Sequence, residues 1–201
     1  VTQLKADGVR VLDVGQGDQA CGETGDGRML EAEEILDDLQ AFFTPPTLLG
    51  KRVLVTAGPT YEAMDPVRGI TNLSSGKMGF ALARSAHEAG AQVTLVAGPV
   101  ALATPHGVRH IDVRSALDMH AAVLALTGHA DVFIATAAVA DWRPAQVAKE
   151  KIKKEGSGSM PAIDWQENPD ILADVALSNR AQAGALYCVG FAAESHDLLK
   201  H

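Results

Sequence analysis

The chain has 201 residues, 47% of them hydrophobic and 21% charged, a composition that excludes a disordered chain and allows one sizeable core. The formal net charge is −8 and no basic stripe dominates, so we do not expect a nucleic-acid-binding protein. The sequence contains neither a run of about 18 apolar residues nor a secretory signal pattern, so we expect a cytoplasmic protein without a membrane partner.

The first 50 residues differ from the rest of the chain in charge. They carry ten acidic and three basic groups, a balance of −7, whereas residues 51–201 carry 15 acidic and 14 basic groups. We interpret this acidic stretch as a separate module. The chain begins at Val1 and not at a methionine, so we expect it to be a piece of a longer protein.

Within the acidic module the sequence predicts one helix. Residues 1–29 are glycine-rich and predict no regular structure, whereas residues 30–43 predict an amphipathic helix. Pro45 and Pro46 end the helix, and residues 44–50 form a short linker. The apolar face of the predicted helix consists of Ile35, Leu36, Leu39, Phe42 and Phe43.

Strands and helices alternate after the linker, and Gly90 stands where a helix is often followed by glycine. Short connections between alternating elements favour parallel strands joined by right-handed crossovers. We therefore predict an α/β fold with a doubly wound, mostly parallel, Rossmann-like sheet, helices on both faces, and a ligand crevice at the carboxyl ends of the strands. The predicted strands are residues 52–57, 92–97, 109–113, 132–136 and 186–191, and the predicted helices are residues 76–89, 116–126 and 168–177.

A glycine-containing turn follows the first predicted strand, and residues 72–79 (Asn-Leu-Ser-Ser-Gly-Lys-Met-Gly) open the next helix. Small hydroxyl and amide side chains around backbone N–H groups at a helix start are typical of a site that holds an anion. A dinucleotide fingerprint requires three glycines in one tight turn, but Gly58 is followed by Pro59. A Walker A motif is also excluded, because Met78 stands where Ser or Thr is required.

Several candidate residues also have an ordinary structural interpretation. From spacing alone, Lys151 belongs to a lysine-rich segment, residues 149–161, that is typical of a solvated loop or lid. Asn72 and Asn168 each fit a helix cap, and Phe191 fits core packing. The small side chains of Ala135, Thr136 and Ala137 fit strand packing as well as close approach of a ligand.

Cys21 and Cys188 are too few for a disulfide framework. No Cys or His pair has the spacing of zinc ligands, so we expect no structural metal. Without further information, Cys21 fits an incidental exposed thiol.

Seven segments, in order, resemble the phosphopantothenoylcysteine synthetase half of the bifunctional coenzyme A biosynthesis proteins, over roughly residues 50–199. Residues 19–29 (Gln-Ala-Cys-Gly-Glu-Thr-Gly-Asp-Gly-Arg-Met) are similar to the C-terminal substrate flap of the flavin-dependent decarboxylase half. The resemblance implies a decarboxylase flap and helix at 1–43, a linker at 44–50 and a C-terminally incomplete phosphopantothenate–cysteine ligase domain at 51–201. The seven segments are residues 56–60, 65–68, 72–79, 137–143, 150–154, 168–170 and 189–194.

The resemblance implies a two-step activation of a carboxylic acid. The carboxylate of 4′-phosphopantothenate attacks the α-phosphate of CTP to give an acyl-cytidylate and pyrophosphate, and the amine of cysteine then displaces CMP. Lysine and Mg²⁺ stabilise the charge that develops on the phosphates. FMN serves the decarboxylase half of the parent protein and is not expected to bind this chain, and a homo-oligomer is expected.

The resemblance also assigns roles to residues. Cys21 becomes the proton donor of the decarboxylase, Asn72 holds the acyl-cytidylate, Lys151 contacts the nucleotide, and Asp141 contacts the ribose of CTP or the metal. The implied nucleotide-binding residues are Ala135, Thr136, Ala137, Asp141, Lys151, Asn168, Pro169, Asp170, Ile171 and Phe191. The implied substrate-binding residues are Gly58, Thr60, Asn72, Ser74, Ser75, Gly76 and Met78.

Two other functions stay open. An NAD(P)-dependent reductase of the short-chain type would share the sheet, but it requires a Tyr-x-x-x-Lys pair, and Tyr61 and Tyr187 are followed at that spacing by Asp65 and Phe191. A non-catalytic fragment or assembly module, in which the acidic arm tethers subunits, is the second alternative. We expect the site to select CTP over ATP and NADPH, and pyrophosphate release to distinguish the three functions.

Overall fold

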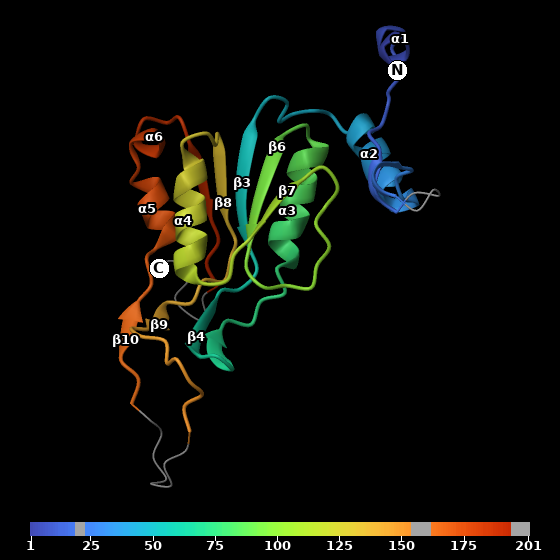
Figure 1. Ribbon diagram of the computed structural model, residues 1–201. Helices are drawn as coiled ribbons and strands as arrows, with labels where there is room; N and C mark the ends of the chain where they lie inside the picture. Colours follow the sequence, from blue (N-terminus) through green and yellow to red (C-terminus); the bar gives the residue numbers. More distant parts are fainter. Residues whose placement is uncertain (19–22, 154–161, 194–201) are drawn as a thin grey trace.

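A computed structural model describes residues 1–18, 23–153 and 162–193 of the chain. Its centre is a sheet of five parallel strands in the order β11-β8-β3-β6-β7 (Figure 1). The predicted strands at 52–57 and 92–97 are confirmed to the residue, and the other three are one residue shorter at one or both ends. The five strands are β3 (Arg52–Ala57), β6 (Gln92–Ala97), β7 (Arg109–Asp112), β8 (Val132–Ala135) and β11 (Tyr187–Gly190).

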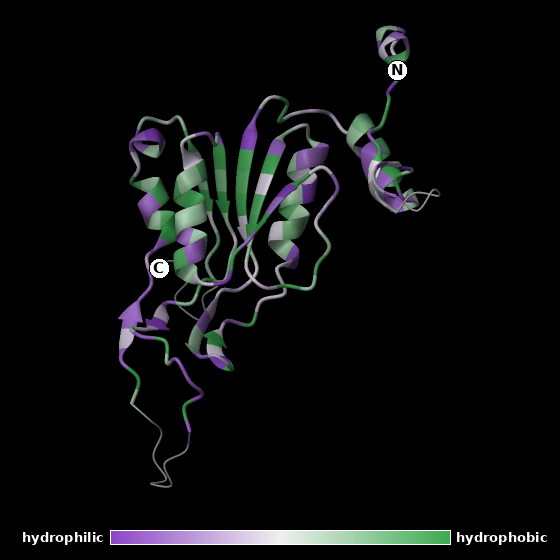
Figure 2. Ribbon diagram, viewed as in Figure 1, coloured by the Kyte–Doolittle hydropathy of each residue, from purple (hydrophilic) through white to green (hydrophobic). Residues whose placement is uncertain are grey.

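Helices cover both faces of this sheet, as the sequence predicts. Helix α3 (Lys77–Glu88) packs on one face, where Phe80 meets the valines of β3. Helices α4 (Ala116–Thr127) and α5 (Ile171–Ala176) pack on the other face, and the short α6 (Asn179–Gln182) follows α5. The three inner strands, β3, β6 and β8, are mostly apolar along their length (Figure 2), because both of their faces are covered.

Two small antiparallel hairpins lie beyond the carboxyl ends of the sheet (Figure 1). One joins β4 (Tyr61–Asp65) to β5 (Arg68–Thr71), and it fills the interval between β3 and α3. The other joins β9 (Trp142–Pro144) to β10 (Trp165–Glu167), which are far apart in the sequence. Neither hairpin was predicted, since their strands are only three to five residues long and mix polar with apolar side chains.

The expectation of no regular structure in residues 1–29 is wrong. They contain helix α1 (Thr2–Ala6) and the hairpin of β1 (Gly15–Asp18) with β2 (Thr24–Arg28). Backbone pairing between the two strands supplies order that glycine-rich segments do not predict from side-chain periodicity.

The predicted amphipathic helix is α2 (Ala32–Phe43). It begins at Ala32 because Glu31 and Glu34 form a capping box, in which Glu31 N donates to Glu34 Oε2 at 2.9 Å. Its acidic side faces the sheet domain. Asp38 lies 3.5 Å from His106, whereas Phe43 on the apolar side is 78% exposed.

The helix predicted over 168–177 begins later, at Ile171. The side chain of Asp170 caps it by accepting a hydrogen bond from Ala173 N at 2.9 Å, while Asn168 is engaged elsewhere. No helix among the residues that the structure describes is long and apolar enough to span a membrane.

Candidate functional site

The chain continues past the ends of β3 and β8 as a short parallel extension. Pro59 and Ala138 form an isolated parallel bridge, Ala138 N donates to Gly58 O at 2.8 Å, and Thr60 N donates to Ala138 O at 3.3 Å. The two segments therefore stay side by side beyond the sheet, and this pairing brings residues 58–60 next to residues 136–140.

The hydroxyl groups of two threonines, Thr60 and Thr136, hold the extension together. Thr60 is fully buried, and its hydroxyl accepts a hydrogen bond from Ala140 N at 3.0 Å. Thr136 Oγ1 donates to Thr56 O at 2.5 Å, which joins the two strands at their last regular pair. Thr60, which the resemblance assigns to the substrate, thus uses its side chain inside the scaffold, and Gly58 beside it is also buried.

Asn72 connects the β4–β5 hairpin to this extension. Its Nδ2 donates to Val139 O at 2.9 Å and to Ala138 O at 3.3 Å. The alternative that Asn72 caps helix α3 is wrong, because Gly76 in the left-handed conformation (φ +73°) occupies that position. The side chain instead lies at the junction of two segments, and its Oδ1 accepts no hydrogen bond from the described residues.

The loop from residue 73 to the start of α3 has an exposed side and a tightly packed side. Ser75 and Met78 are exposed, whereas Ser74 Oγ accepts a hydrogen bond from Gly76 N at 3.3 Å. Gly79 has no room for a side chain, because a Cβ there would lie 2.5 Å from Ala57 Cβ and 2.6 Å from Thr136 Oγ1. This contact fixes α3 against the ends of β3 and β8.

Asn168 also connects two segments, on the other side of the extension. Its Nδ2 donates to Ala140 O at 2.7 Å, its backbone N–H donates to Asp141 O at 2.8 Å, and its Oδ1 accepts from Arg143 at 2.9 Å. The helix-cap interpretation of Asn168 is therefore wrong. Its neighbour Pro169 is half-buried, and Ile171 belongs to the core beneath α4.

A largely apolar recess brings Asn72 and Asp141 together at this end of the molecule. Trp142 is 49% exposed and Trp165 is 43% exposed, so both rings offer surface to a ligand. Sequence reasoning missed four of the lining residues, Ile70, Ala140, Trp142 and Trp165. For Trp165 the available signal was an aromatic residue in a polar, exposed strand. The recess is lined by Ile70, Asn72, Ala140, Asp141, Trp142 and Trp165.

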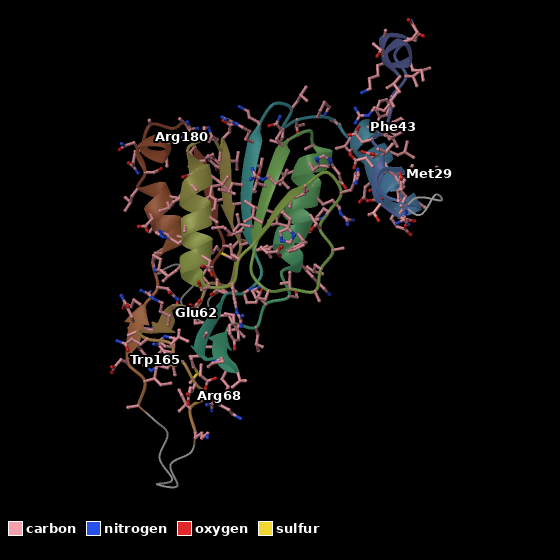
Figure 3. All side chains as sticks on the ribbon, in the orientation of Figure 1. Met29, Phe43, Glu62, Arg68, Trp165 and Arg180 are labelled. Atoms are coloured by element: carbon pink, nitrogen blue, oxygen red, sulfur yellow. The ribbon has the colours of Figure 1, made fainter. Side chains whose placement is uncertain are left out.

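The β4–β5 hairpin is anchored to the start of helix α4 by a buried carboxylate. Glu62 is 3% exposed, and its Oε1 accepts a hydrogen bond from Ala116 N at 2.9 Å. Tyr61 N donates to Arg114 O at 2.7 Å, and the guanidinium of Arg114 lies 4.7 Å from the centre of the Tyr61 ring. Figure 3 shows Glu62, Arg68 and Trp165 at this end of the molecule, opposite Arg180.

The remaining predicted residues are placed as follows. Phe191 N donates to Ala135 O at 3.2 Å, and its ring is 50% exposed, so the core-packing interpretation is wrong. Lys151 is exposed and does not line the recess. Ala137 N is 3.4 Å from Thr56 Oγ1. Cys21 and the part of the lysine-rich segment from 154 to 161 lie outside the described residues.

One carboxylate that lines the recess, that of Asp141, could take part in holding a metal ion. No group of three or more His, Cys, Asp or Glu side chains in the described ranges could enclose a metal ion. Mg²⁺ that accompanies phosphates is usually bound by one or two carboxylates and several waters. The single exposed carboxylate of Asp141 at the recess fits that mode.

Comparison with known proteins gives a consistent family. The family described as DNA/pantothenate metabolism flavoprotein C-terminal domain matches residues 48–201. The coenzyme A biosynthesis bifunctional protein CoaBC of Vibrio cholerae is 55% identical over 182 residues, 90% of this chain and 45% of that protein. CoaBC of Escherichia coli is 48% identical over 197 residues, 97% of this chain and 48% of that protein. The chain thus spans about half the length of these curated relatives.

A solved structure shares the fold. The crystal structure of the C-terminal domain of a CoaBC protein matches with a TM-score of 0.65 and 42% identity, over 76% of this chain and 69% of that chain. The match supports the Rossmann-like arrangement of parallel sheet and flanking helices.

Proposed function

Since the chain belongs to the DNA/pantothenate metabolism flavoprotein C-terminal domain family, we propose that it catalyses the CTP-dependent joining of 4′-phosphopantothenate to cysteine in coenzyme A biosynthesis. The observation that carries the proposal is the meeting of Asn72 and Asp141 at one recess beyond the carboxyl ends of the sheet. This is where ligands of open α/β sheets bind.

The first step is a nucleotidyl transfer. A carboxylate oxygen of 4′-phosphopantothenate attacks the α-phosphorus of CTP, the bond to the bridging oxygen breaks, and pyrophosphate leaves. Asp141 would hold Mg²⁺, which neutralises charge on the phosphates when it is bound. The exposed ammonium of Lys151 supplies a positive charge for the same phosphates.

The second step forms the amide. The amine nitrogen of cysteine attacks the acyl carbon of the acyl-cytidylate, CMP leaves, and the amine loses a proton. The Nδ2 of Asn72 donates to the carbonyls of Ala138 and Val139. Its Oδ1 is therefore the atom that can accept a hydrogen bond from the incoming amine and orient it.

The decarboxylase chemistry implied by the resemblance belongs to a different part of the proposal. Cys21 would protonate the enethiolate left after FMN-dependent oxidation and loss of CO₂. This role requires FMN, which the resemblance assigns to the decarboxylase half, so we assign only the ligase step to the sheet domain.

Calorimetry with the full-length protein tests the nucleotide choice. CTP with Mg²⁺ should bind more tightly than ATP or NADPH, and CTP should release pyrophosphate only when 4′-phosphopantothenate is present. Asp141→Asn should weaken the binding of magnesium CTP by roughly tenfold or more, the scale of a lost charged contact. Asp112→Asn is the matched control, because Asp112 is also exposed at a strand end but lies outside the recess.

Two outcomes would overturn the proposal. NADPH binding as tight as CTP binding would favour the reductase. Absence of pyrophosphate release from a folded protein with both substrates would favour the assembly module.

A further inference from the structure

The segment that carries Lys151 is fastened to the β4–β5 hairpin at three points. Ala148 N donates to Met64 O at 3.0 Å. Further along, Ile152 N donates to Asp65 Oδ2 at 3.1 Å, and Arg68 Nη2 donates to Ile152 O at 2.5 Å. The described part of the lysine-rich segment is thus attached to the same hairpin that carries Asn72 at its end.

Asp65 is the centre of this attachment. Its side chain is fully buried, and it accepts hydrogen bonds from Val67 N and Arg68 N at 2.9 Å each and from Arg68 Nη2 at 2.7 Å. Burial alone would raise the pKa of the Asp65 carboxyl, but the hydrogen bonds from Arg68, Val67 and Ile152 outweigh burial and keep the pKa well below its usual range. The carboxylate therefore stays ionised and can hold its donors at neutral pH.

The attachment is specific to one residue, Ile152. The N–H of Ile152 donates to Asp65, and its C=O accepts from Arg68, so both polar backbone groups of this residue are hydrogen-bonded. Ile152 is half-buried, whereas Lys151 and Lys153 on either side are exposed. Fixing this residue from both sides limits where the Cα of Lys151 can lie, which a free loop would not do.

We propose that Asp65 and Arg68 are positioning residues for Lys151, and that through Ile152 they place its ammonium on the phosphates of the nucleotide. The inference rests on the proposed function, since it needs Lys151 to act in nucleotidyl transfer. Preorganisation of one charged group is worth a large factor in rate, because a misplacement of about 1 Å can cost on the order of a hundredfold. The pair does not itself touch the reacting atoms.

The main test compares single and double variants of the full-length protein. Lys151→Gln should slow pyrophosphate release by roughly two to three decades, the scale of one transition-state charge contact. Asp65→Asn should lower kcat for pyrophosphate release by about one to two decades. If Asp65 acts through Lys151, the double variant should be no slower than Lys151→Gln alone, because effects within one unit are not additive. Multiplied effects in the double variant would overturn the proposal.

A matched control lies at the amino end of the sheet, where β3 and β8 begin. Asp131 also pairs with an arginine, Arg52, through two side-chain hydrogen bonds. Asp131→Asn should therefore reproduce any general loss of stability while it leaves pyrophosphate release unchanged. Equal loss of release in Asp131→Asn and Asp65→Asn, at equal thermal stability, would reduce Asp65 to a structural role. If Asp65→Asn does not fold, Arg68→Lys keeps the charge but loses the two-pronged contact and serves in its place.

Limited trypsin digestion separates failure of the attachment from failure of the proposed function. Without any ligand, Asp65→Asn should be cut faster after Lys149, Lys151 and Lys153 than Asp131→Asn or the unaltered protein. Unchanged cutting would refute the attachment whatever reaction the protein catalyses. Faster cutting of Asp65→Asn, combined with no pyrophosphate release from the unaltered protein, would support the attachment and reject the ligase function. The proposed catalytic role of Asp65 and Arg68 would then be rejected as well.

Discussion

An aspartate–arginine pair lies at each end of the central sheet, and the two pairs bind different parts of the chain. At the amino end, Asp131 binds the side chain and the backbone N–H of Arg52, so it joins neighbouring strands of the sheet. At the carboxyl end, Asp65 and Arg68 reach the backbone of Ile152, which belongs to no strand. An aspartate–arginine pair thus joins two strands at one end and holds the segment that contains Lys151 at the other.

The exposure of the two carboxylates agrees with this division. The side chain of Asp131 is 27% exposed, whereas that of Asp65 is fully buried. A buried carboxylate needs all of its hydrogen bonds, so replacing it has consequences for every group that it binds. We therefore expect changes at the carboxyl end to alter catalysis and changes at the amino end to alter stability.

Asn72→Asp should give the largest separation between the two ends. The substitution replaces a donor with a carboxylate that faces the carbonyl oxygens of Ala138 and Val139, so the side chain will be repelled from its place. We expect amide formation to fall by roughly two decades or more, the scale of a lost oriented contact. Pyrophosphate release should persist, because the role that we propose for Asn72 lies in the second step. Both half-reactions can be followed separately by pyrophosphate and CMP release.

Thr71→Val controls for a loosened hairpin. Thr71 Oγ1 donates to Thr60 O at 2.7 Å from the same hairpin end, but it does not line the recess. If this variant loses amide formation as selectively as Asn72→Asp, or if Asn72→Asp slows both steps equally, Asn72 acts only as a scaffold residue.

Gly79→Ala should have the next largest effect, on stability first. A methyl group at this position would collide with Ala57 and Thr136 and push α3 away from the carboxyl end of the sheet. We expect the free energy of unfolding to fall by about 1–3 kcal/mol, as for other overpacked contacts. Gly128 follows the last residue of α4, and a Cβ there would have no atom within 4 Å, so Gly128→Ala should be neutral. Denaturant unfolding of both variants measures the difference, and equal stabilities would contradict the close contact.

The sequence predicted the strands of the central sheet better than the hairpins beyond its carboxyl end, for a physical reason. Strands β3 and β6 are runs of apolar residues buried on both faces, so local composition alone determines them. The β4–β5 and β9–β10 hairpins depend on distant partners such as Ala148 and Asp164, which no local pattern reveals. The β1–β2 hairpin was also missed, because its glycine-rich strands have no side-chain pattern that predicts their pairing.

Two of the residues that line the recess were among the predicted site residues, but their arrangement was not predicted. Resemblance selected Asn72 and Asp141, and the structure places both at one recess. It did not indicate that Asn168 holds Ala140 and Asp141 in place, or that Trp165 completes the recess, because these contacts cross more than 20 positions of the sequence. The resemblance also selected Lys151, but it did not indicate that the β4–β5 hairpin binds the neighbouring residue Ile152.

Acid titration of stability gives the smallest expected effect and isolates the amino end. Hydrogen bonds from the Arg52 side chain and backbone lower the pKa of Asp131 from its ordinary 3.8 to about 2 in the folded state, against the opposing effect of burial. A carboxyl whose pKa is lower when folded stabilises the protein above the unfolded pKa, and this contribution disappears as the pH falls through the folded pKa. Asp131→Asn should therefore be less stable than the unaltered protein at pH 7, and the gap should shrink between about pH 4 and pH 2. Arg52→Gln should show the same loss, since it removes the side-chain partner that causes the shift, and both variants should keep their pyrophosphate release at pH 7. A gap in the free energy of unfolding that is as wide at pH 2 as at pH 7 would mean that the pair contributes through packing and not through charge.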